Sequence, residues 1–561
     1  MLAKVLQGEY RIVLSAALTI GFFSLLSKLL GVVRNRIFAG EFGAGDTLDA
    51  YFTAFLIPDF LYNILIVGVL SSVFIPVFAE YLVRDRAEAW RLVNVVLTVF
   101  AALLIIFSCG AIIFAPQLIG LIAVGFDDTK QALTVELARI MFVSAVLLGV
   151  SNIVSSILQT HKMFFSFALA PVMYNLGIII GALFFVGPFG AQGLALGVVL
   201  GALLHLGIQL PSLFRLGFSF RPLFDLWHPG LRAIIRLSLP RTVGLAAQQF
   251  NFVVITAMAS TISAGSIAVF NFANDLQYVP IGIIAFAFVS AVFPLLSASF
   301  ARRDMRSFLD EFYLAVNQIL FLVIPVSVFL ILERAQIVRV LFGYGEFSWE
   351  DTRLTAAVLG AFALSIFAQS LVPLFVRAFY ALHNTKTPVF INICSVFVNI
   401  GLSFYFLHLM RADGAFAHAV SALFRVSDLD ATILALPLAF SLSSVINLLW
   451  LYFALSRAVV PFDSVPILRS LTRINIATLA MALVVYPALV MLSSVVNMQT
   501  FLGIFLQGVG AFVAGITAYG VVAYLLKIPE FFIFRQAFFL PVKKIFLSRI
   551  FPISTDTPDK L

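Results

Sequence analysis

A strongly apolar stretch over residues 24–81 carries charged side chains where a membrane helix rarely tolerates them. Lys28 and Arg34 lie near its start, and Asp49 and Asp59 follow further along the chain. A charge at the centre of a bilayer costs about 2.5–3.5 kcal/mol on insertion scales. Such residues usually face a protein interior or a water-filled cavity. They therefore predict the binding of an ionic ligand inside a membrane protein.

The polar residues of the first segment share one face of a helix. At 100° per residue, they fall within an arc of about 120°, and Leu, Val, Ile and Phe occupy the opposite face. They are Ser24, Ser27, Lys28, Arg34 and Asn35, and Gly31 lies within the same arc. An Arg fork and a Lys point charge on one face suit a phosphate group. We therefore predict that Lys28 and Arg34 bind an anionic head group.

Three further apolar segments carry clustered polar residues. Polar faces on four helices that meet would line a central cavity between two lobes, and we expect these residues to contribute to substrate binding. They are Asp59 and Asn63 in the second segment, Arg241, Gln248 and Asn251 in the seventh, and Asn274 and Asp275 in the eighth.

Each of these residues also has a simpler structural interpretation. Arg34 and Arg36 could anchor the end of a span by extending toward the lipid head groups. Asp59 and Asp275 could be structural partners of nearby cations. The Asn and Gln side chains could hydrogen-bond between helices without contacting a ligand. Lys28, about four turns inside its helix, is the residue that these alternatives explain least.

The composition places the chain in a membrane. It has 561 residues, of which 62% are hydrophobic and 11% charged, whereas soluble domains are about 25% charged. A spanning helix needs about 20 mainly apolar residues. We predict an all-α polytopic membrane protein with fourteen spans, at residues 12–38, 48–82, 92–115, 131–159, 165–187, 191–212, 231–261, 265–299, 310–333, 352–382, 387–408, 431–456, 470–494 and 500–527.

The loops predict the orientation of these spans. Cytoplasmic loops of membrane proteins carry an excess of Lys and Arg. With the N-terminus in the cytoplasm, most of the 35 Lys and Arg residues lie in cytoplasmic loops or in the C-terminal tail. The opposite loops hold Lys130, Arg334, Arg339, Arg353, Arg411 and Arg425. We expect both termini in the cytoplasm, and the net charge of +8 then reflects topology, not a nucleic-acid surface.

The chain contains an internal repeat. Lys162 precedes Asn175-Leu176-Gly177, and Lys386 precedes Asn399-Ile400-Gly401 at the same spacing. Ala44-Gly45 with Pro76 and Ala264-Gly265 with Pro294 form a second related pair. Parallel repeats with a site at their interface are typical of transporters. We predict a first lobe at 1–220 with spans 1–6, a second lobe at 221–460 with spans 7–12, spans 13 and 14 at 461–530, and a basic cytoplasmic tail at 531–561.

The sequence contains no signature of catalysis or of metal binding. Cys109 and Cys394 both lie in apolar runs, which predicts neither a disulfide framework nor a cysteine metal site. There is no P-loop, GxGxxG or HExxH motif. We expect no enzyme activity, no metal and no cofactor. Transport would then be driven by an ion gradient, the membrane potential or the substrate gradient.

The stretch SKLLGVVRNRIFAGEFGAGDTLDAYFTAFLIPDFLYNILIVGVLSSVFIPVFAEY resembles the opening signature of the MurJ (MviN) family, the lipid II flippases of bacteria. Similar matches occur in FANDLQYVPIGIIAFAFVSAVFPLLS and FYALHNTKTPV. The resemblance implies a MOP-superfamily fold that works by alternating access in the bacterial inner membrane. The implied cargo is undecaprenyl pyrophosphate bearing a disaccharide-pentapeptide, with spans 13 and 14 as a groove for its lipid tail. The family's cavity cations fall on Lys28 and Arg34, and the aspartate of its D-A-F motif falls on Asp49.

The sequence departs from the family pattern at several cavity positions. Tyr62-Asn63 replaces the Arg pair that the family has on the second span. Val67 stands at a position that is acidic in the family. The Arg of the eighth-span A-D-R motif is Asp275, and the seventh-span Asp of members with a sodium site is Ile255. The predicted cavity is therefore less cationic than that of other members, and the resemblance carries no sodium site onto this chain.

Lipid II flipping is the leading hypothesis for function. One alternative is a flippase for another polyprenyl-linked oligosaccharide, and a second is a MATE-like cation-coupled drug antiporter, against which spans 13 and 14 argue. A scaffold for cell-wall synthesis that transports nothing is a third alternative, but a scaffold needs no polar cavity faces. The expected partners are a lipid-linked pyrophosphate glycan, membrane lipids and a coupling cation or the membrane potential.

Overall fold

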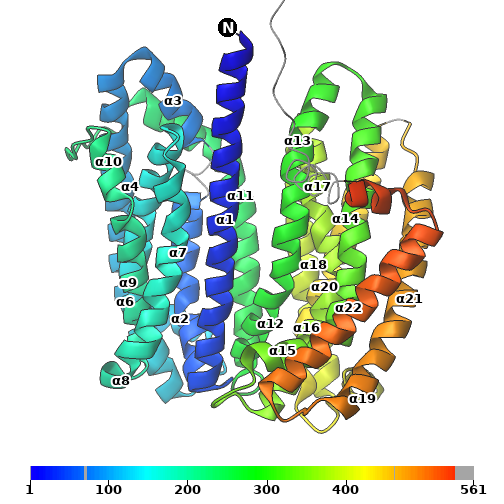
Figure 1. Cartoon of the computed structure of the whole chain (residues 1–561). Helices are drawn as coiled ribbons and strands as arrows, with labels where there is room; N and C mark the ends of the chain where they lie inside the picture. Colours follow the sequence, from blue (N-terminus) through cyan, green and yellow to red (C-terminus); the bar gives the residue numbers. More distant parts are fainter. Residues whose placement is uncertain (1, 68–72, 460, 537–561) are drawn as a thin grey trace, which may run out of the picture. The chain divides into compact units, whose positions relative to one another are not determined.

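The computed structural model describes residues 2–67, 73–459 and 461–536, except for the side chains of residues 2–17, 67, 240, 241 and 243. The regular structure in these ranges is helical (Figure 1). The first ten helices are α1 (Leu2–Phe42), α2 (Asp46–Tyr62), α3 (Phe74–Arg84), α4 (Arg86–Ile113), α5 (Ala115–Ile122), α6 (Asp128–Thr160), α7 (Phe164–Ile180), α8 (Val186–Phe189), α9 (Gln192–Gly207) and α10 (Leu210–Arg215).

The remaining helices follow in chain order. They are α11 (Pro229–Ser260), α12 (Ser266–Pro280), α13 (Phe286–Ala301), α14 (Met305–Leu332), α15 (Arg334–Phe342), α16 (Trp349–Ala363), α17 (Ile366–Ala381), α18 (Lys386–Arg411), α19 (Ala415–Phe424), α20 (Ala435–Ala458), α21 (Val465–Val495) and α22 (Phe501–Leu525). Short π-helical turns at Asn63–Val67, Gly181–Phe185 and Ile281–Ala285 extend α2, α7 and α12, and a 3₁₀ turn at Ala431–Leu434 precedes α20.

The helix lengths confirm the prediction of an all-α polytopic membrane protein. In the described ranges, 11 helices are long and apolar enough to cross a membrane, or up to 13 spans if each of two bent helix pairs counts as one. The bent pairs are Pro229–Leu239 with Gly244–Ser260 and Trp349–Ala363 with Ile366–Ala381. These helices correspond to all predicted spans but the second. That span, 48–82, includes residues 68–72, which lie outside the described residues.

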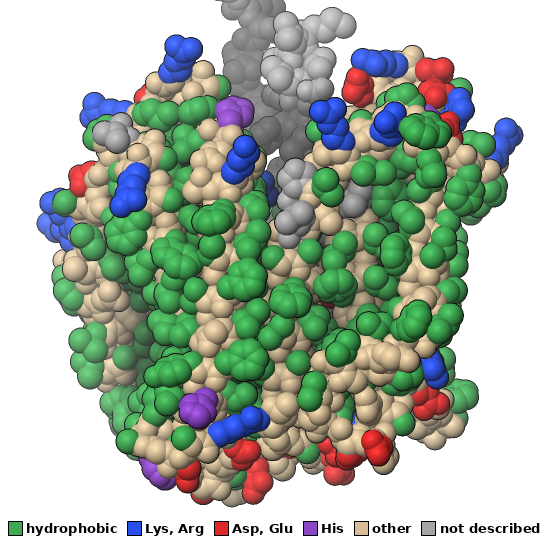
Figure 2. Space-filling view, turned by 180° about the vertical axis from the view of Figure 1, so that it is seen from behind, with side chains coloured by type: hydrophobic (Ala, Val, Ile, Leu, Met, Phe, Trp, Pro, Cys, Tyr) green, Lys and Arg blue, Asp and Glu red, His purple; other side chains and the backbone are tan. Residues whose placement is uncertain are grey.

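The surface has the character of a membrane protein. Figure 2 shows hydrophobic side chains over the middle of the helices, with charged side chains gathered toward their ends. Phe397, near the middle of α18, and Leu483, near the middle of α21, have exposures of 65% and 68%. Exposed apolar side chains in the middle of long helices are suited to contact with lipid tails.

The helix contacts divide the chain into two compact units. Unit 1 comprises residues 1–276, 338–362 and 389–443, and unit 2 comprises residues 277–337, 363–388 and 444–561. Unit 1 therefore combines the whole predicted first lobe with parts of the predicted second lobe. The lobe boundaries at residues 220, 460 and 530 remain predictions.

In unit 1, small residues allow the helices to pack closely. A Cβ added to Gly177 of α7 would lie 2.3 Å from the Cα of Gly201 on α9. One turn further along, at the start of the π-helical turn that extends α7, a Cβ on Gly181 would lie 2.2 Å from the Cα of Gly197. Backbones that approach this closely are typical of membrane helix pairs with small residues at the interface. The pair α7–α9 supports α1, which packs along α7 (Figure 1).

In unit 2, α21 and α22 form a helix hairpin that packs on α14 (Figure 1). The Tyr519 hydroxyl of α22 donates to the Phe321 carbonyl oxygen of α14 at 2.7 Å. Gln507 Nε2 donates to the Leu489 carbonyl oxygen of α21 at 2.7 Å. The two C-terminal spans are thus fastened to each other and to α14 by buried polar contacts as well as by apolar packing.

Candidate functional site

Arg34 of α1 lies in a polar junction that joins three helices of unit 1. Its guanidinium lies 3.8 Å from Asp275 Oδ2 of α12 and donates to Asn35 Oδ1 at 3.1 and 3.0 Å. Asn35 Nδ2 donates to Asp275 Oδ2 at 2.7 Å. A 3.5 Å contact joins Arg34 Nη1 to Asn175 Oδ1 of α7. Two predicted site residues, Arg34 and Asp275, therefore meet, and the carboxylate partly neutralises the guanidinium.

Lys28 lies on the same polar face of α1 but has a different environment. Its side chain is exposed, and no hydrogen-bond or ion-pair partner occurs for it among the described residues. Nearby Ser27 accepts at Oγ from Asn175 Nδ2 at 3.1 Å, so the flank of α1 next to Lys28 faces α7. Lys28 thus offers a full positive charge to a ligand, whereas Arg34 already has a carboxylate partner.

Asp59 and Asn63 also come together, beside α11. Asn63 Nδ2 donates to Asp59 Oδ2 at 2.8 Å, and the Asp59 carboxyl lies near the side chain of Gln249 of α11. The π-helical turn that begins at Asn63 follows Pro58, which interrupts the hydrogen-bonding ladder of α2. The nearby residue on α11 is Gln249, whereas the predicted residue Gln248 is exposed.

Asn251 lies in a contact that repeats one in the first half of the chain. Asn399 Nδ2 of α18 donates to Asn251 Oδ1 of α11 at 2.9 Å. Asn175 Nδ2 of α7 donates to Ser27 Oγ of α1, and both pairs are 148 residues apart in sequence. The Asn-x-Gly motifs of the internal repeat therefore make equivalent helix contacts, which favours the structural interpretation of Asn251.

Two further predicted site residues, Asn274 and Arg241, lie on α12 and α11. Asn274 is half-buried on α12, beside Asp275. Arg241 belongs to α11, but its side chain lies outside the described residues.

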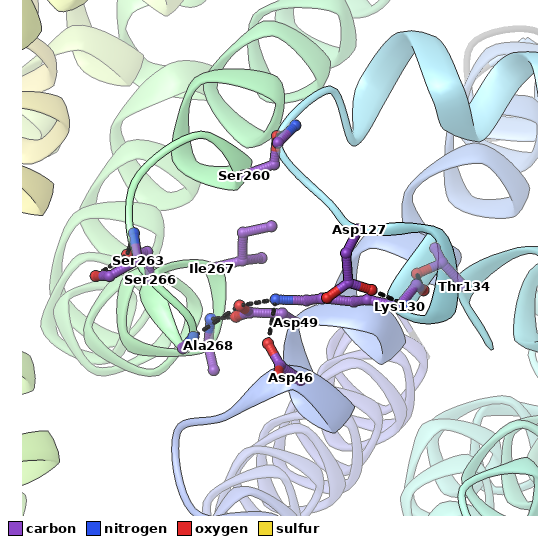
Figure 3. A network of polar contacts seen from close by, with 12 residues as sticks. Asp46, Asp49, Asp127, Lys130, Thr134, Ser260, Ser263, Ser266, Ile267 and Ala268 are labelled. Atoms are coloured by element: carbon purple, nitrogen blue, oxygen red, sulfur yellow. Dashed lines mark hydrogen bonds and ion pairs between the residues drawn. The ribbon is translucent and has the colours of Figure 1, made fainter. Parts of the chain in front are cut away.

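Asp49 occupies a buried network at the ends of three helices of unit 1 (Figure 3). Its Oδ2 lies 2.8 Å from Lys130 Nζ of α6 and accepts from the Gly265 backbone amide at 2.8 Å. Its Oδ1 accepts from the Ala268 amide of α12 at 2.9 Å. Lys130 also contacts Asp46 Oδ1 at 2.7 Å. Asp49 thus connects the starts of α2, α6 and α12, and its carboxylate is held by amides at a helix N-terminus, where negative charge is favoured.

Close backbone contacts surround this network. A Cβ on Gly265, whose φ is +83°, would lie 1.9 Å from the Ala44 carbonyl oxygen. A Cβ on Gly125 would lie 2.1 Å from the Ser260 carbonyl oxygen. A Cβ on Gly345 would lie 2.1 Å from the Gly40 carbonyl oxygen. Only glycine permits these approaches, so this end of unit 1 is tightly closed.

Charged side chains reinforce the same end. Arg36 donates to the Leu341 carbonyl oxygen at 3.0 Å. Its guanidinium also lies 4.6 Å from the centre of the Tyr344 ring. Arg353, near the start of α16, forms an ion pair with Asp428 that holds the pKa of that carboxyl below its ordinary value. Arg36 therefore has a structural role at the closed end rather than a place in a ligand site.

Sequence reasoning did not identify Lys130 as a member of these clusters, and it placed Asn35 on the polar face of the first span without predicting it as a binding residue. Sequence reasoning assigned Lys130 to a loop. In the structure, Asp127 is the N-cap of α6 and accepts a hydrogen bond from the Lys130 amide at 2.8 Å, so Lys130 lies in the first turn of that helix. Among the described residues there is no group of three or more His, Cys, Asp or Glu side chains that could hold a metal ion. The arrangement is suited to binding an anion on α1 and to closing one end of the helix bundle.

The fold is that of an all-α polytopic membrane protein and is shared with solved structures of MurJ and MATE proteins. A solved structure of lipid II flippase MurJ, in an inward closed conformation, matches with a TM-score of 0.73 and 24% identity over 90% of this chain and 98% of that chain. An inward-facing MATE family multidrug transporter of the MOP superfamily matches with a TM-score of 0.61 and 17% identity over 77% of this chain and 95% of the other. These likenesses confirm the predicted fold.

The chain belongs to the lipid II flippase MurJ family, whose sequence profile matches residues 38–509. Lipid II flippase MurJ of Burkholderia cenocepacia is 29% identical over 409 residues, which are 71% of this chain and 79% of the relative. A family member from Buchnera aphidicola subsp. Acyrthosiphon pisum is 28% identical over 521 residues, or 90% of this chain and 96% of the relative. The resemblance found in the sequence is thus confirmed, and the chain is a transporter and not an enzyme.

Proposed function

We propose that this chain is a lipid II flippase, which moves undecaprenyl-pyrophosphate-linked disaccharide-pentapeptide from the inner to the outer leaflet for peptidoglycan synthesis. The observation that carries the proposal is the family match over residues 38–509. The exposed ammonium of Lys28, which has no partner among the described residues, adds chemical support, because it can bind a pyrophosphate oxygen. Relatives named for lipid II flipping match most of the chain.

The distribution of Lys and Arg supports a multi-pass inner-membrane protein with both termini in the cytoplasm. In that orientation, α2, α6 and α12 begin at the extracytoplasmic side. The network of Asp49 and Lys130 is then an extracytoplasmic gate in its closed state. Opening the gate requires the Asp49 carboxylate to leave the Gly265 and Ala268 amides, which lie in the repeat that follows the first lobe.

The cationic face of α1 is the proposed contact for the pyrophosphate. Lys28 binds it directly, and Arg34 binds it when the phosphate displaces Asp275. Asp275 thus serves as an internal anion that occupies Arg34 in the absence of cargo, since its carboxylate accepts the same hydrogen bonds as a phosphate oxygen. Asp59, Asn63 and Gln248 are proposed polar contacts for the glycan.

Two further parts of the hypothesis concern energy and the lipid tail. We assign coupling to a cation or to the membrane potential, because no nucleotide-binding motif is present in the sequence. Spans 13 and 14, formed by α21 and α22, are proposed to guide the polyprenyl tail along their apolar outer surface. Leu483, Val490 and Phe512 contribute to that surface, with exposures of 68%, 57% and 43%.

The test is complementation of a bacterium depleted of its own flippase. The full chain should restore growth, and purified protein in liposomes should move fluorescent lipid II between leaflets. Lys28→Ala and Arg34→Ala should abolish both activities at unchanged protein levels. Growth rescue by both variants would contradict the cationic-face mechanism. Failure of the wild-type chain in liposomes with lipid II, but success with another polyprenyl-pyrophosphate oligosaccharide, would reassign the cargo.

A further inference from the structure

A buried carboxyl group lies at the corner between α14 and α15 of unit 2. Glu333 follows the last residue of α14, and only 2% of its surface is exposed. Its Oε1 is buried and has no hydrogen-bond partner among the described residues. An ionised carboxylate in such a place is costly unless it is paired or hydrogen-bonded.

The opposing surface on α22 is shaped to receive this side chain. A Cβ on Gly508 would lie 3.2 Å from Glu333 Oε2, so the glycine leaves a notch against which the carboxyl packs. A buried carboxyl oxygen that has no donor among the described residues favours the neutral, protonated form of Glu333, because burial penalises the charged form.

Among the described residues, no ion pair joins Glu333 to a cation. Arg334 directs Nη1 to the Ile331 carbonyl oxygen at 2.8 Å, and Gln336 is the nearest side chain of α15 to the notch. α22 has no charged residue, and its Tyr519 donates to Phe321. The charged residues of α14 and α21 lie near the opposite ends of those helices, at Arg306, Asp310, Glu311, Arg469 and Arg473. Burial accordingly raises the pKa of Glu333 to about 8.

We propose that Glu333 is a proton-binding site that controls how the α21–α22 hairpin packs on α14. In the protonated state, the neutral carboxyl fits the Gly508 notch. Release of the proton to water leaves a buried anion, which draws in water and loosens α22 from the corner. The ligand is a proton and not a metal ion, because the described residues provide no cluster of three acidic, His or Cys ligands. This proposal depends on the orientation proposed above in one respect, namely which side of the membrane supplies the proton.

The proton can be observed directly in the full-length protein in lipid nanodiscs. Infrared difference spectra between about pH 6 and about pH 10 should contain the C=O band of a protonated carboxyl that is lost at high pH. Glu333→Gln should remove this band, whereas Glu311→Gln, a matched change on the same unit, should leave it. A band that persists in Glu333→Gln, or a wild-type spectrum without one, overturns the proposal.

A distance measurement tests the effect on packing. With Cys109→Ala and Cys394→Ala, spin labels at the exposed positions Leu314 of α14 and Val513 of α22 report the separation of these helices. The distance distribution should broaden at high pH in the wild-type background and stay narrow in Glu333→Gln. Gly508→Ala should broaden it already at neutral pH by filling the notch.

The outcomes of this experiment are independent of flippase activity. A wild-type distribution that does not change with pH overturns the proposal, as does a pH response that Glu333→Gln retains. If sodium at fixed pH, rather than pH, controls the distance, the site binds a metal cation and the proton assignment is wrong. If the distance distribution responds to pH as expected but the protein does not transport lipid II, the proposed function is contradicted and the proton site is not.

Discussion

Lys130 Nζ lies 2.8 Å from Asp49 Oδ2 and 2.7 Å from Asp46 Oδ1, so that one ammonium group of α6 joins two carboxylates of α2. The two carboxylates differ in burial: the Asp49 side chain is 2% exposed, whereas the Asp46 side chain is 62% exposed. Asp49 alone also accepts hydrogen bonds from the start of α12. The inner pair therefore holds the closed end, and the outer pair adds little to it.

Asp49→Asn should destabilise the closed end, because it leaves the buried Lys130 without its main counter-ion. Breaking one partner of a buried pair costs about 3–5 kcal/mol. A cysteine placed at the buried position Ser266, in a background without other cysteines, should become accessible to a membrane-impermeant maleimide. Asp46→Asn is the matched control and should cost less than about 1 kcal/mol. Equal labelling of the two variants would show that Asp49 does not hold the gate.

Gly265→Ala should prevent normal closure of the same end. Its φ of +83° is strained for any residue with a side chain, and the added Cβ would lie 1.9 Å from the Ala44 carbonyl oxygen. A strained backbone position alone costs about 1–3 kcal/mol, before the clash is counted. Thermal unfolding in detergent should show a clear loss of stability. Gly401→Ala is the control, since nothing lies within 4 Å of its added Cβ; a similar loss in that variant would refute the explanation.

Lys28→Ala should weaken pyrophosphate binding more than it affects folding, because the side chain has no partner in the described structure. Losing one charge-assisted hydrogen bond of about 1.5–3 kcal/mol lowers affinity about ten- to a hundredfold. Titration of purified protein with undecaprenyl pyrophosphate measures the change. Lys28→Arg should retain binding, and a variant that loses binding only because it unfolds would be identified by its melting temperature.

Asp275→Asn should have the opposite effect on affinity. Removing the carboxylate 3.8 Å from the Arg34 guanidinium leaves that cation available to the pyrophosphate, so binding should tighten. The gain should disappear in the double variant with Arg34→Ala. An Asp275→Asn variant that binds more weakly would mean that Asp275 positions Arg34 for the ligand and does not compete with it.

The thermal stability of the protein should fall as pH rises from about 4.5 through about 8, because the pKa of Glu333 is raised by burial from 4.5 to about 8. In that window the folded state keeps a proton that the unfolded state releases, so ionisation favours unfolding. Above the folded-state pKa the contribution of Glu333 is fully lost. Glu333→Gln should flatten this part of the stability profile. A profile identical to that of the wild-type chain would exclude Glu333 as its cause.

Much of the architecture could be predicted from the residues themselves. Long apolar runs predicted the spans because a helix in a bilayer must satisfy its backbone polar groups internally. The repeated Asn-x-Gly motifs indicated equivalent helices, and Asn175 and Asn399 make equivalent contacts. The polar face of α1 was also predictable, since residues at helical spacing share a side whatever the rest of the fold does.

The sequence by itself determined the class of protein, the spans and the residues that could carry charge into the membrane, because hydropathy and helical periodicity are local properties. Only the tertiary structure decided which charges remain available. Asn35 and Asp275 are 240 residues apart, and Asp49 and Gly265 are 216 apart, yet each pair is joined by a hydrogen bond. Packing of distant helices therefore occupies Arg34 and Asp49 and leaves Lys28 exposed, and no local pattern encodes that difference.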